Sequence, residues 1–280
     1  MQTKLSEQEI DEKLKNIKLI ASDLDGTLLL NGAQDLNADT CSLIRALIDK
    51  GIIFFAASGR QYTNLQRLFA PIADDIGYLC ENGAVSFWKG KRIHKEVMDK
   101  ALAQELIRDI WNTDGGEVLL SGEMVSYLKP KKSEYFYHMR DVVKNDVVLV
   151  DDIFNTPEEY MKISLYEKGG VKNEQLWQER FGSRCTVVTG GRDWLDMMPK
   201  GVNKASALKK ILAELNISAE QCLAIGDNDN DREMLKMVGL ASSVISAKSE
   251  IRSLAAIETD TVENLFRRIL NLRDKESKIA

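Results

Sequence analysis

Short apolar runs alternate with helical segments in the first part of the chain, and this alternation limits the possible folds more than any other feature. The runs lie at 17–21, 52–57 and 77–80. Between them, 39–50 carries apolar residues at helical spacing, and 63–70 is predicted as a second helix. This order is typical of a parallel sheet with helices on both faces. Ligands of such sheets bind beyond the carboxyl ends of the strands, so the residues after each run are candidates for a site.

The pattern changes after residue 84. Asn82-Gly83 and Lys89-Gly90 are strong turn signals, and the segment beyond them mixes strands with helices. Neighbouring paired strands indicate an antiparallel sheet that carries helices, which we interpret as a domain inserted at 85–190. Its predicted strands lie at 117–121, 124–128, 160–166 and 184–189, and its predicted helices at 99–112, 133–144 and 172–181.

The parallel-sheet pattern resumes after the insertion. We therefore predict one α/β core domain made of 1–84 and 191–280, a doubly wound parallel sheet, with residues 1–16 as a helical or frayed N-terminal extension. The second part of this core is predicted to contain strands at 193–198, 222–225 and 240–245, and helices at 203–215, 231–238 and 262–272.

The overall composition argues against several classes of protein. A net charge of -5 and a pI of about 5.4 disfavour binding to a nucleic-acid backbone. The one basic run, 129–132, is predicted to be a solvated loop. No apolar run approaches the ~20 residues that span a bilayer, and the first 18 residues lack the apolar centre of a signal peptide. The four cysteines are scattered, without the spacing of a zinc or disulfide framework, so we expect a cytoplasmic protein.

Two carboxylates directly follow the first apolar run, in Asp23-Leu24-Asp25-Gly26-Thr27-Leu28. The alternative is a solvated turn, since Asp-Gly is a common turn signal. At the ligand-binding edge of a sheet, however, one carboxylate can attack phosphorus and form an acyl phosphate. The other can protonate the leaving oxygen and then activate water. Since Asp25 must hold its proton in the first step, we expect it to be buried.

Two further segments could hold a phosphoryl group. Ser58-Gly59-Arg60 follows the second strand and offers a hydroxyl and backbone amides, although such a sequence alone is more often a loop. Lys204 begins a predicted helix between two core strands, where a lysine could neutralise phosphate. Lys200 is a competitor for that role.

A third acidic segment, at 226–231, follows the strand at 222–225. Clustered carboxylate oxygens favour a hard cation such as Mg²⁺. A calcium loop is excluded because its sixth position would be Arg232 rather than glycine and its twelfth Val238 rather than glutamate. The alternative is a cluster that caps the following helix, which Asp231 could do while Asp227 binds metal.

Together these motifs resemble the haloacid dehalogenase superfamily, and more closely its Cof-type phosphatases with a C2B cap. The matching segments are 23–28, Ser58-Gly59-Arg60, Asn82-Gly83-Ala84, Gly201-Val202-Asn203-Lys204, and Gly226-Asp227 with Asn230-Asp231 and Glu233-Met234. The resemblance covers nearly the whole chain from Ile17. It implies a Rossmann-like core whose inserted cap, at 85–190, closes over the site and selects the substrate.

The resemblance also implies a role for each matching residue. Asp23 would be the nucleophile and a Mg²⁺ ligand, and Asp25 the general acid and base, with its carbonyl on the metal. Asp227 would complete the metal ligands and Asp231 would support them. The residues implied to bind the phosphoryl group are Ser58, Gly59, Lys204 and Asn230.

The predicted activity is hydrolysis of a sugar phosphate or similar small phosphomonoester. A phosphomutase would use the same Asp23 chemistry but return the phosphoryl group to its substrate. A dehalogenase would need no metal, which Asp25 and Asp227 argue against, and a non-catalytic relative would have lost its acidic residues first. Candidate substrate contacts, each more simply explained by packing, are His94, His138, Arg140, Trp88, Trp111, Trp177, Tyr135 and Tyr137.

Overall fold

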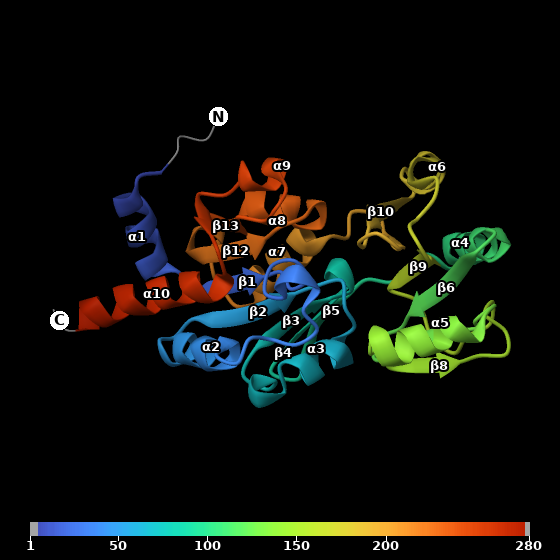
Figure 1. Cartoon of the computed structure of the whole chain (residues 1–280), viewed down its shortest axis with the longest axis horizontal. Coiled ribbons are helices and arrows are strands. Elements are labelled where there is room, and N and C mark those ends of the chain that lie inside the picture. Colours follow the sequence, from blue (N-terminus) through green and yellow to red (C-terminus); the bar gives the residue numbers. More distant parts are fainter. Residues whose placement is uncertain (1–4, 278–280) are drawn as a thin grey trace.

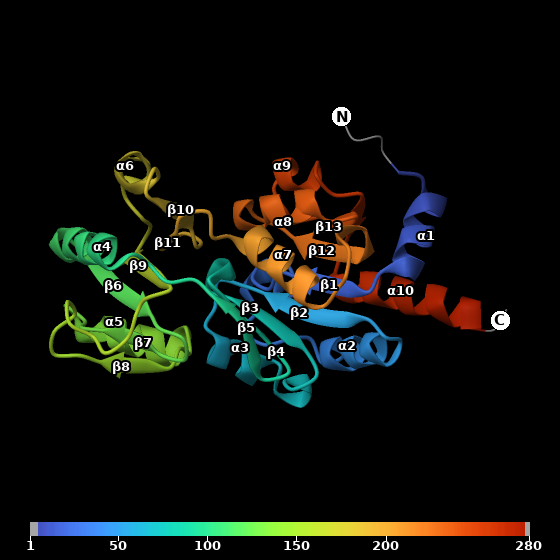
Figure 2. The same ribbon diagram turned by 180° about the vertical axis from the view of Figure 1, so that it is seen from behind.

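Two β-sheets with their covering helices make up the computed structural model, which describes residues 5–277 (Figure 1). The larger sheet has eight strands in the order β14-β13-β12-β1-β2-β3-β4-β5, and the smaller has six in the order β10-β11-β9-β6-β7-β8. The two sheets lie side by side rather than stacked (Figures 1 and 2). The predicted α/β class, a parallel-sheet core with an inserted α/β unit, is confirmed.

The strands and helices of the larger unit come from both ends of the chain. Its strands are β1 (Leu19–Ser22), β2 (Ile53–Ala57), β3 (Gly77–Cys80), β4 (Val85–Trp88), β5 (Lys91–Lys95), β12 (Cys222–Gly226), β13 (Leu240–Val244) and β14 (Ile257–Thr259). Its helices are α1 (Glu7–Asn16), α2 (Thr40–Asp49), α3 (Tyr62–Leu68), α7 (Lys204–Glu214), α8 (Arg232–Met237), α9 (Ser249–Arg252) and α10 (Val262–Ser277).

The smaller unit is built from the middle of the chain. Its strands are β6 (Gly116–Ser121), β7 (Ser126–Leu128), β8 (Val147–Leu149), β9 (Lys162–Glu167), β10 (Cys185–Thr189) and β11 (Trp194–Pro199). Its helices are α4 (Lys100–Asn112), α5 (Ser133–Tyr137), which continues into a π-helical turn at His138–Val142, and α6 (Glu174–Phe181).

The strand order of the larger sheet reverses at β1, which positions the site. From β1 the chain moves outward through β2 and β3, then returns to build β12, β13 and β14 on the other side, all in parallel. Every residue of β1 and β12 is buried, as expected for central strands covered on both faces. The register pairs Ser22 with Ile225, so the segments after β1 and β12 leave the sheet side by side. Such a switch point is where ligands bind in open parallel sheets.

The predicted insertion boundaries at 85 and 190 differ from the sheet membership. β4 and β5 form an antiparallel hairpin that extends the larger sheet from β3, so they do not belong to the smaller sheet. The run at 193–198 becomes β11, which pairs antiparallel with β9 and β10 in the smaller sheet instead of joining the core. Hairpin and apolar-run signals are local, whereas sheet membership depends on distant hydrogen-bond partners.

The remaining elements follow the predictions closely. The N-terminal extension is helical at Glu7–Asn16, where Ser6 and Glu9 form a capping box and Ile10 and Leu14 are buried. The short elements β8, β14 and α9 were not predicted. All four cysteines are unpaired thiols, and no helix among residues 5–277 has the length and apolar character to cross a membrane.

Candidate active site

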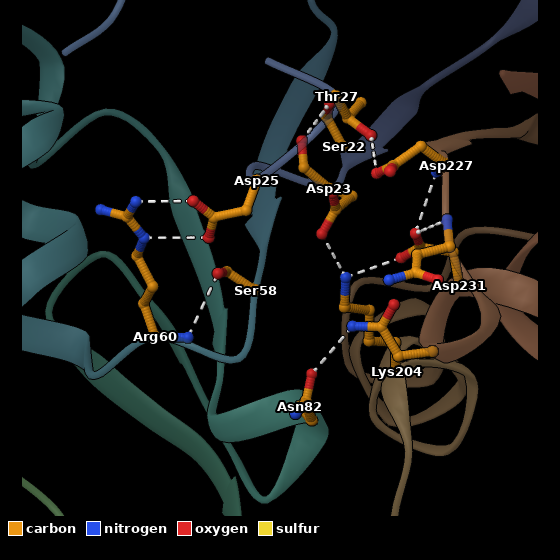
Figure 3. Close-up of polar contacts among 12 residues, drawn as sticks. Ser22, Asp23, Asp25, Thr27, Ser58, Arg60, Asn82, Lys204, Asp227 and Asp231 are labelled. Atoms are coloured by element: carbon orange, nitrogen blue, oxygen red, sulfur yellow. Dashed lines mark hydrogen bonds and ion pairs between the residues drawn. The ribbon is translucent and has the colours of Figure 1, made fainter. Parts of the chain in front are cut away.

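The acidic segments after β1 and β12 converge at the switch point of the larger sheet (Figure 3). Asp23 donates its backbone N–H to the carbonyl of Ile225 over 2.9 Å, which joins the two segments directly. Gly26 has a φ of 91°, and a Cβ there would lie 2.4 Å from Oδ2 of Asp227. A side chain at position 26 would therefore be both strained and in collision, so glycine is needed for this approach.

Asp23 is the buried carboxylate at the centre of this site. It is 4% exposed, its Oδ1 accepts a hydrogen bond from Nζ of Lys204, and its Oδ2 is buried without a partner among the described residues. Burial, together with the negative charge of Asp231 and against the pull of Lys204, raises the pKa of Asp23 well above its ordinary value. The unpaired oxygen is what a cation or an electrophile would satisfy.

Lys204 supplies the positive charge of the site from the first turn of α7. Its Nζ contacts Asp23 and donates to Oδ1 of Asp231 over 2.6 Å, and its side chain is fully buried. Burial alone would lower the pKa of Lys204, but the two carboxylates raise it above its ordinary value, so the lysine stays charged. The competitor Lys200 instead donates to the carbonyl of Gly182 and lies outside the site.

The residues present fit a divalent metal. Asp23, Asp227 and Asp231 offer carboxylate oxygens that all lie within 4.8 Å of one another, a donor set suited to a hard cation. Asp231 is already engaged, because its Oδ2 accepts the backbone N–H groups of Asp227 and Asn228 at 3.0 and 3.1 Å and its Oδ1 binds Lys204. This leaves Asp23 and Asp227 as the carboxylates free to bind metal, with Asp231 supporting the loop.

Thr27 is a member of the site whose role the sequence did not indicate. Its Oγ1 donates to Oδ1 of Asp227 over 2.8 Å and so orients that carboxylate toward Asp23 (Figure 3). The contact joins residues 200 positions apart, which explains why only the folded chain reveals it.

The expected burial of Asp25 is wrong. Its side chain is 54% exposed and forms a two-point ion pair with Arg60, with Nε–Oδ2 and Nη2–Oδ1 distances of 3.0 and 2.6 Å. Figure 3 shows this pair on the opposite side of Asp23 from Lys204. A guanidinium fits a carboxylate in this geometry, and the partner lies in the segment that follows β2.

The predicted phosphate-binding residues surround the same space. Ser58 is 1% exposed and its Oγ accepts the N–H of Arg60 over 3.1 Å. Asn82 links Ser58 to Asn230. Its backbone N–H donates to the carbonyl of Ser58, and its Oδ1 accepts from Nδ2 of Asn230 over 3.2 Å. A Cβ at Gly59 would lie only 3.0 Å from Nδ2 of Asn82, so these two segments pack tightly.

A cavity of about 570 Å³ opens between the two sheets at this point. Asp23, Asp25, Ser58, Gly59 and Asn230 line it from the larger unit, whereas Lys204, Asp227 and Asp231 are not among its lining residues. The smaller unit contributes residues that include His138, Asn145, Arg192 and Trp194. Of the candidate substrate contacts named from the sequence, His138 is the one that lines this cavity.

His94 lies on β5 of the larger sheet and serves the fold. Its Nδ1 is 2.6 Å from Oγ of Ser86 and its Nε2 is 3.1 Å from the carbonyl of Gly83. A neutral ring satisfies both contacts by donating from Nε2 and accepting at Nδ1. Burial is the main cause that lowers the pKa of His94 below its ordinary value.

We therefore expect acid to destabilise the fold through His94. Because the folded state resists protonation of this ring, its stabilising contribution is complete above the pKa of about 6.5 in the unfolded chain and declines as the pH falls below that value. Thermal melting from pH 7.5 to 5.0 should show a smaller loss of Tm in His94→Gln than in the wild type. Parallel curves for the two proteins would contradict this assignment.

The chain is similar to known proteins in both sequence and structure. Residues 20–265 match the family model of haloacid dehalogenase-like hydrolases. The chain is 25% identical to a 5-amino-6-(5-phospho-D-ribitylamino)uracil phosphatase of Escherichia coli K12, over 94% of this chain and 97% of that protein. It is 28% identical to an HMP-PP phosphatase of Citrobacter koseri, over 79% and 82%. A solved structure from Eubacterium rectale is similar with a TM-score of 0.80 and 27% identity, over 90% of this chain and 98% of that one.

Proposed function

The chain belongs to the haloacid dehalogenase-like hydrolases, as its motifs predicted, and from this premise we propose that it is a Mg²⁺-dependent phosphatase acting through an aspartyl-phosphate on Asp23. The observation that carries the proposal is the buried Oδ2 of Asp23, which has no hydrogen-bond partner among residues 5–277, in a residue that lines the cavity together with Ser58. A buried carboxylate oxygen without a hydrogen-bond partner lowers the stability of the fold. Such groups are typical of functional sites.

Each side chain then has a defined part in a hydrolysis of two steps. In the first step, an oxygen of Asp23 forms a bond to phosphorus, the bond from phosphorus to the leaving oxygen breaks, and Asp25 donates a proton to that oxygen. In the second step, water attacks the phosphorus, Asp25 accepts the water's proton, and inorganic phosphate leaves Asp23. Ser58, the amide of Gly59, Asn230 and Lys204 hold the phosphoryl oxygens, and Lys204 also balances their charge.

Mg²⁺ would be held by Asp23, Asp227 and the carbonyl of Asp25. When bound, it supplies the positive charge that lets two anions, the carboxylate and the phosphate, approach each other. Arg60 acts on the other side of the site, where it orients Asp25 until substrate enters. We further propose that the smaller sheet and its helices act as the cap that covers the cavity and selects the substrate.

The substrate is proposed to be a small phosphomonoester. A cavity of about 570 Å³ suits a metabolite rather than a polymer, and its lining is rich in polar groups. Two relatives are named for a phosphorylated ribitylaminouracil and for HMP-PP, so these compounds join sugar phosphates as the first candidates.

The test is phosphate release from a panel of sugar phosphates, nucleotides, the two candidates above and an aryl phosphate. We expect release with Mg²⁺ and none with excess chelator, because the carboxylates at 23 and 227 repel phosphate without a cation. Interconversion of sugar phosphates with little free phosphate would instead indicate a mutase. A folded, Mg²⁺-binding protein that releases no phosphate from any compound would overturn the proposal.

A further inference from the structure

A second buried charge cluster lies beside the phosphate-binding segments, and the two proposed reaction steps do not use it. At its centre is Lys162 of β9, only 6% exposed. Its Nζ lies 2.7 Å from Oε2 of Glu81 and 3.2 Å from Oδ2 of Asp196, and it donates to the carbonyl of Gly59 over 2.9 Å. Glu81 and Asp196 are also buried.

The cluster joins the two sheets. Lys162 and Asp196 belong to the smaller sheet, whereas Gly59 and Glu81 follow strands β2 and β3 of the larger one. Hydroxyl groups of the smaller sheet complete the contacts, with Ser121 donating to Glu81 over 3.2 Å and Ser164 donating to Asp196 over 2.6 Å. Thus the ammonium group of a cap strand is fixed on the loop that carries Ser58.

The cluster also reaches the other side of the phosphate site. Nδ2 of Asn82 donates to Oδ2 of Asp196 over 2.9 Å, while Oδ1 of the same amide accepts from Asn230. One side chain therefore connects the cap strand β11 with a predicted phosphate ligand. Glu81 and Asn82 have φ values of 50° and 53°, a left-handed conformation that non-glycine residues adopt only when their surroundings hold them.

The charge of Lys162 is well matched to this place. The two carboxylates outweigh the effect of burial and raise the pKa of Lys162 above its ordinary value. Burial raises the pKa of Glu81, although Lys162 opposes that shift. A buried ion pair adds little net stability compared with apolar packing, so stability alone is a weak reason for such a cluster. The geometry of the cluster gives a better reason. The cluster forms only when the smaller sheet lies against the loop that carries Ser58 and Gly59.

A second contact zone joins the two units without taking part in the Lys162 cluster. Helix α3 meets the smaller unit through Asn64, whose Nδ2 donates to the carbonyl of Val143 over 2.6 Å, and through Arg67, which pairs with Asp146 at 3.0 Å. The Arg67 and Asp146 side chains are 49% and 45% exposed. Oδ1 of Asn64 accepts a hydrogen bond from Nη1 of Arg60 over 3.4 Å, but among the described residues no hydrogen bond or ion pair joins Asn64 or Arg67 to Ser58 or Gly59.

We propose that Lys162 is a positioning residue that couples docking of the cap to the arrangement of the phosphate-binding groups. Through the carbonyl of Gly59 it holds the Ser58 loop, and through Asp196 and Asn82 it holds Asn230. The inference rests on the proposed function only in taking this site as the one that binds phosphate.

The test separates positioning from the simple need to pair a buried charge. Lys162→Met leaves Glu81 and Asp196 without a cation, so we expect a lower Tm. Adding Glu81→Gln in the same chain removes one of the two negative charges and should restore much of that Tm. Affinity for inorganic phosphate with Mg²⁺, measured by calorimetry, should stay at least about tenfold weaker in both variants, because the hydrogen bond to Gly59 is lost. The matched control is Lys168→Met, an exposed lysine at the end of the same strand region.

Recovery of both Tm and phosphate affinity in the double variant would overturn the proposal, since Lys162 would then only neutralise its neighbours. The single variant is not essential, because the comparison of the double variant with the wild type gives the answer if Lys162→Met does not fold. Phosphate binding is independent of turnover. A wild type that binds phosphate but hydrolyses nothing would therefore sink the proposed function while leaving this test intact, and a wild type that binds no phosphate would overturn the inference itself.

Discussion

Asp23→Asn should lose activity by about 10⁴-fold or more while the protein folds as well as the wild type. Removal of the nucleophile from a covalent hydrolase costs up to about 10⁶-fold in kcat, and an amide oxygen is a poor nucleophile. Stability should change in the opposite direction. Because burial raises the pKa of Asp23 above its value in the unfolded chain, keeping it ionised at neutral pH destabilises the folded state. The neutral amide removes that effect, so the Tm without metal should be equal to or above that of the wild type.

The measurement pairs steady-state phosphate release with thermal melting, each with and without Mg²⁺. Mg²⁺ at about 100 times its Kd should stabilise the wild type by about 2.7 kcal/mol and the variant by less, because a ligand has been removed. Asp35→Asn, which changes an exposed carboxylate, is the matched control. Activity within tenfold of the wild type would rule out Asp23 as the nucleophile, and a large fall in Tm would reject the electrostatic argument.

Lys204→Met should lower both stability and catalytic activity. The side chain is fully buried between Asp23 and Asp231, and methionine is of similar length but carries no charge. Removing one partner of a buried ion pair typically destabilises by about 3–5 kcal/mol, because the remaining charges are left uncompensated. Loss of one group that stabilises the phosphoryl oxygens should lower kcat/KM by about 10²–10³-fold.

Denaturant unfolding and phosphate release test the two effects separately. Mg²⁺ should return part of the lost stability, because it supplies positive charge to the same carboxylates, but it should not return the activity. Lys209→Met, on the same helix but exposed, should change neither quantity appreciably. Full recovery of activity in saturating Mg²⁺ would show that Lys204 only balances charge and takes no part in holding phosphate.

The candidate reacting groups could be proposed from the sequence because their signals are local. A buried strand that ends in two acids is visible within a few residues, and the chemistry of carboxylates limits what such a segment does. The same holds for Lys204, at the start of an amphipathic helix, and for the acids at 227 and 231. The structure brings these side chains to one switch point, as the order of strands and helices predicted.

Other features depend on partners that are distant in the chain. The environment of Asp25 is one such feature. Its carboxylate pairs with Arg60, whose side chain reaches it from the segment that follows β2. The sheet that receives β4, β5 and β11 is another, since an apolar run or a tight turn is compatible with either sheet.

By itself, then, the sequence determined the α/β class, the family and the acidic and basic groups of the candidate site, all of which follow from short-range patterns and side-chain chemistry. Only the tertiary structure decided how the smaller sheet meets the larger one. The contact from Lys162 to Gly59 spans 103 positions and that from Asn82 to Asp196 spans 114. Hydrogen bonds between such distant residues form when packing of both sheets brings them within about 3 Å, a condition that no local pattern contains.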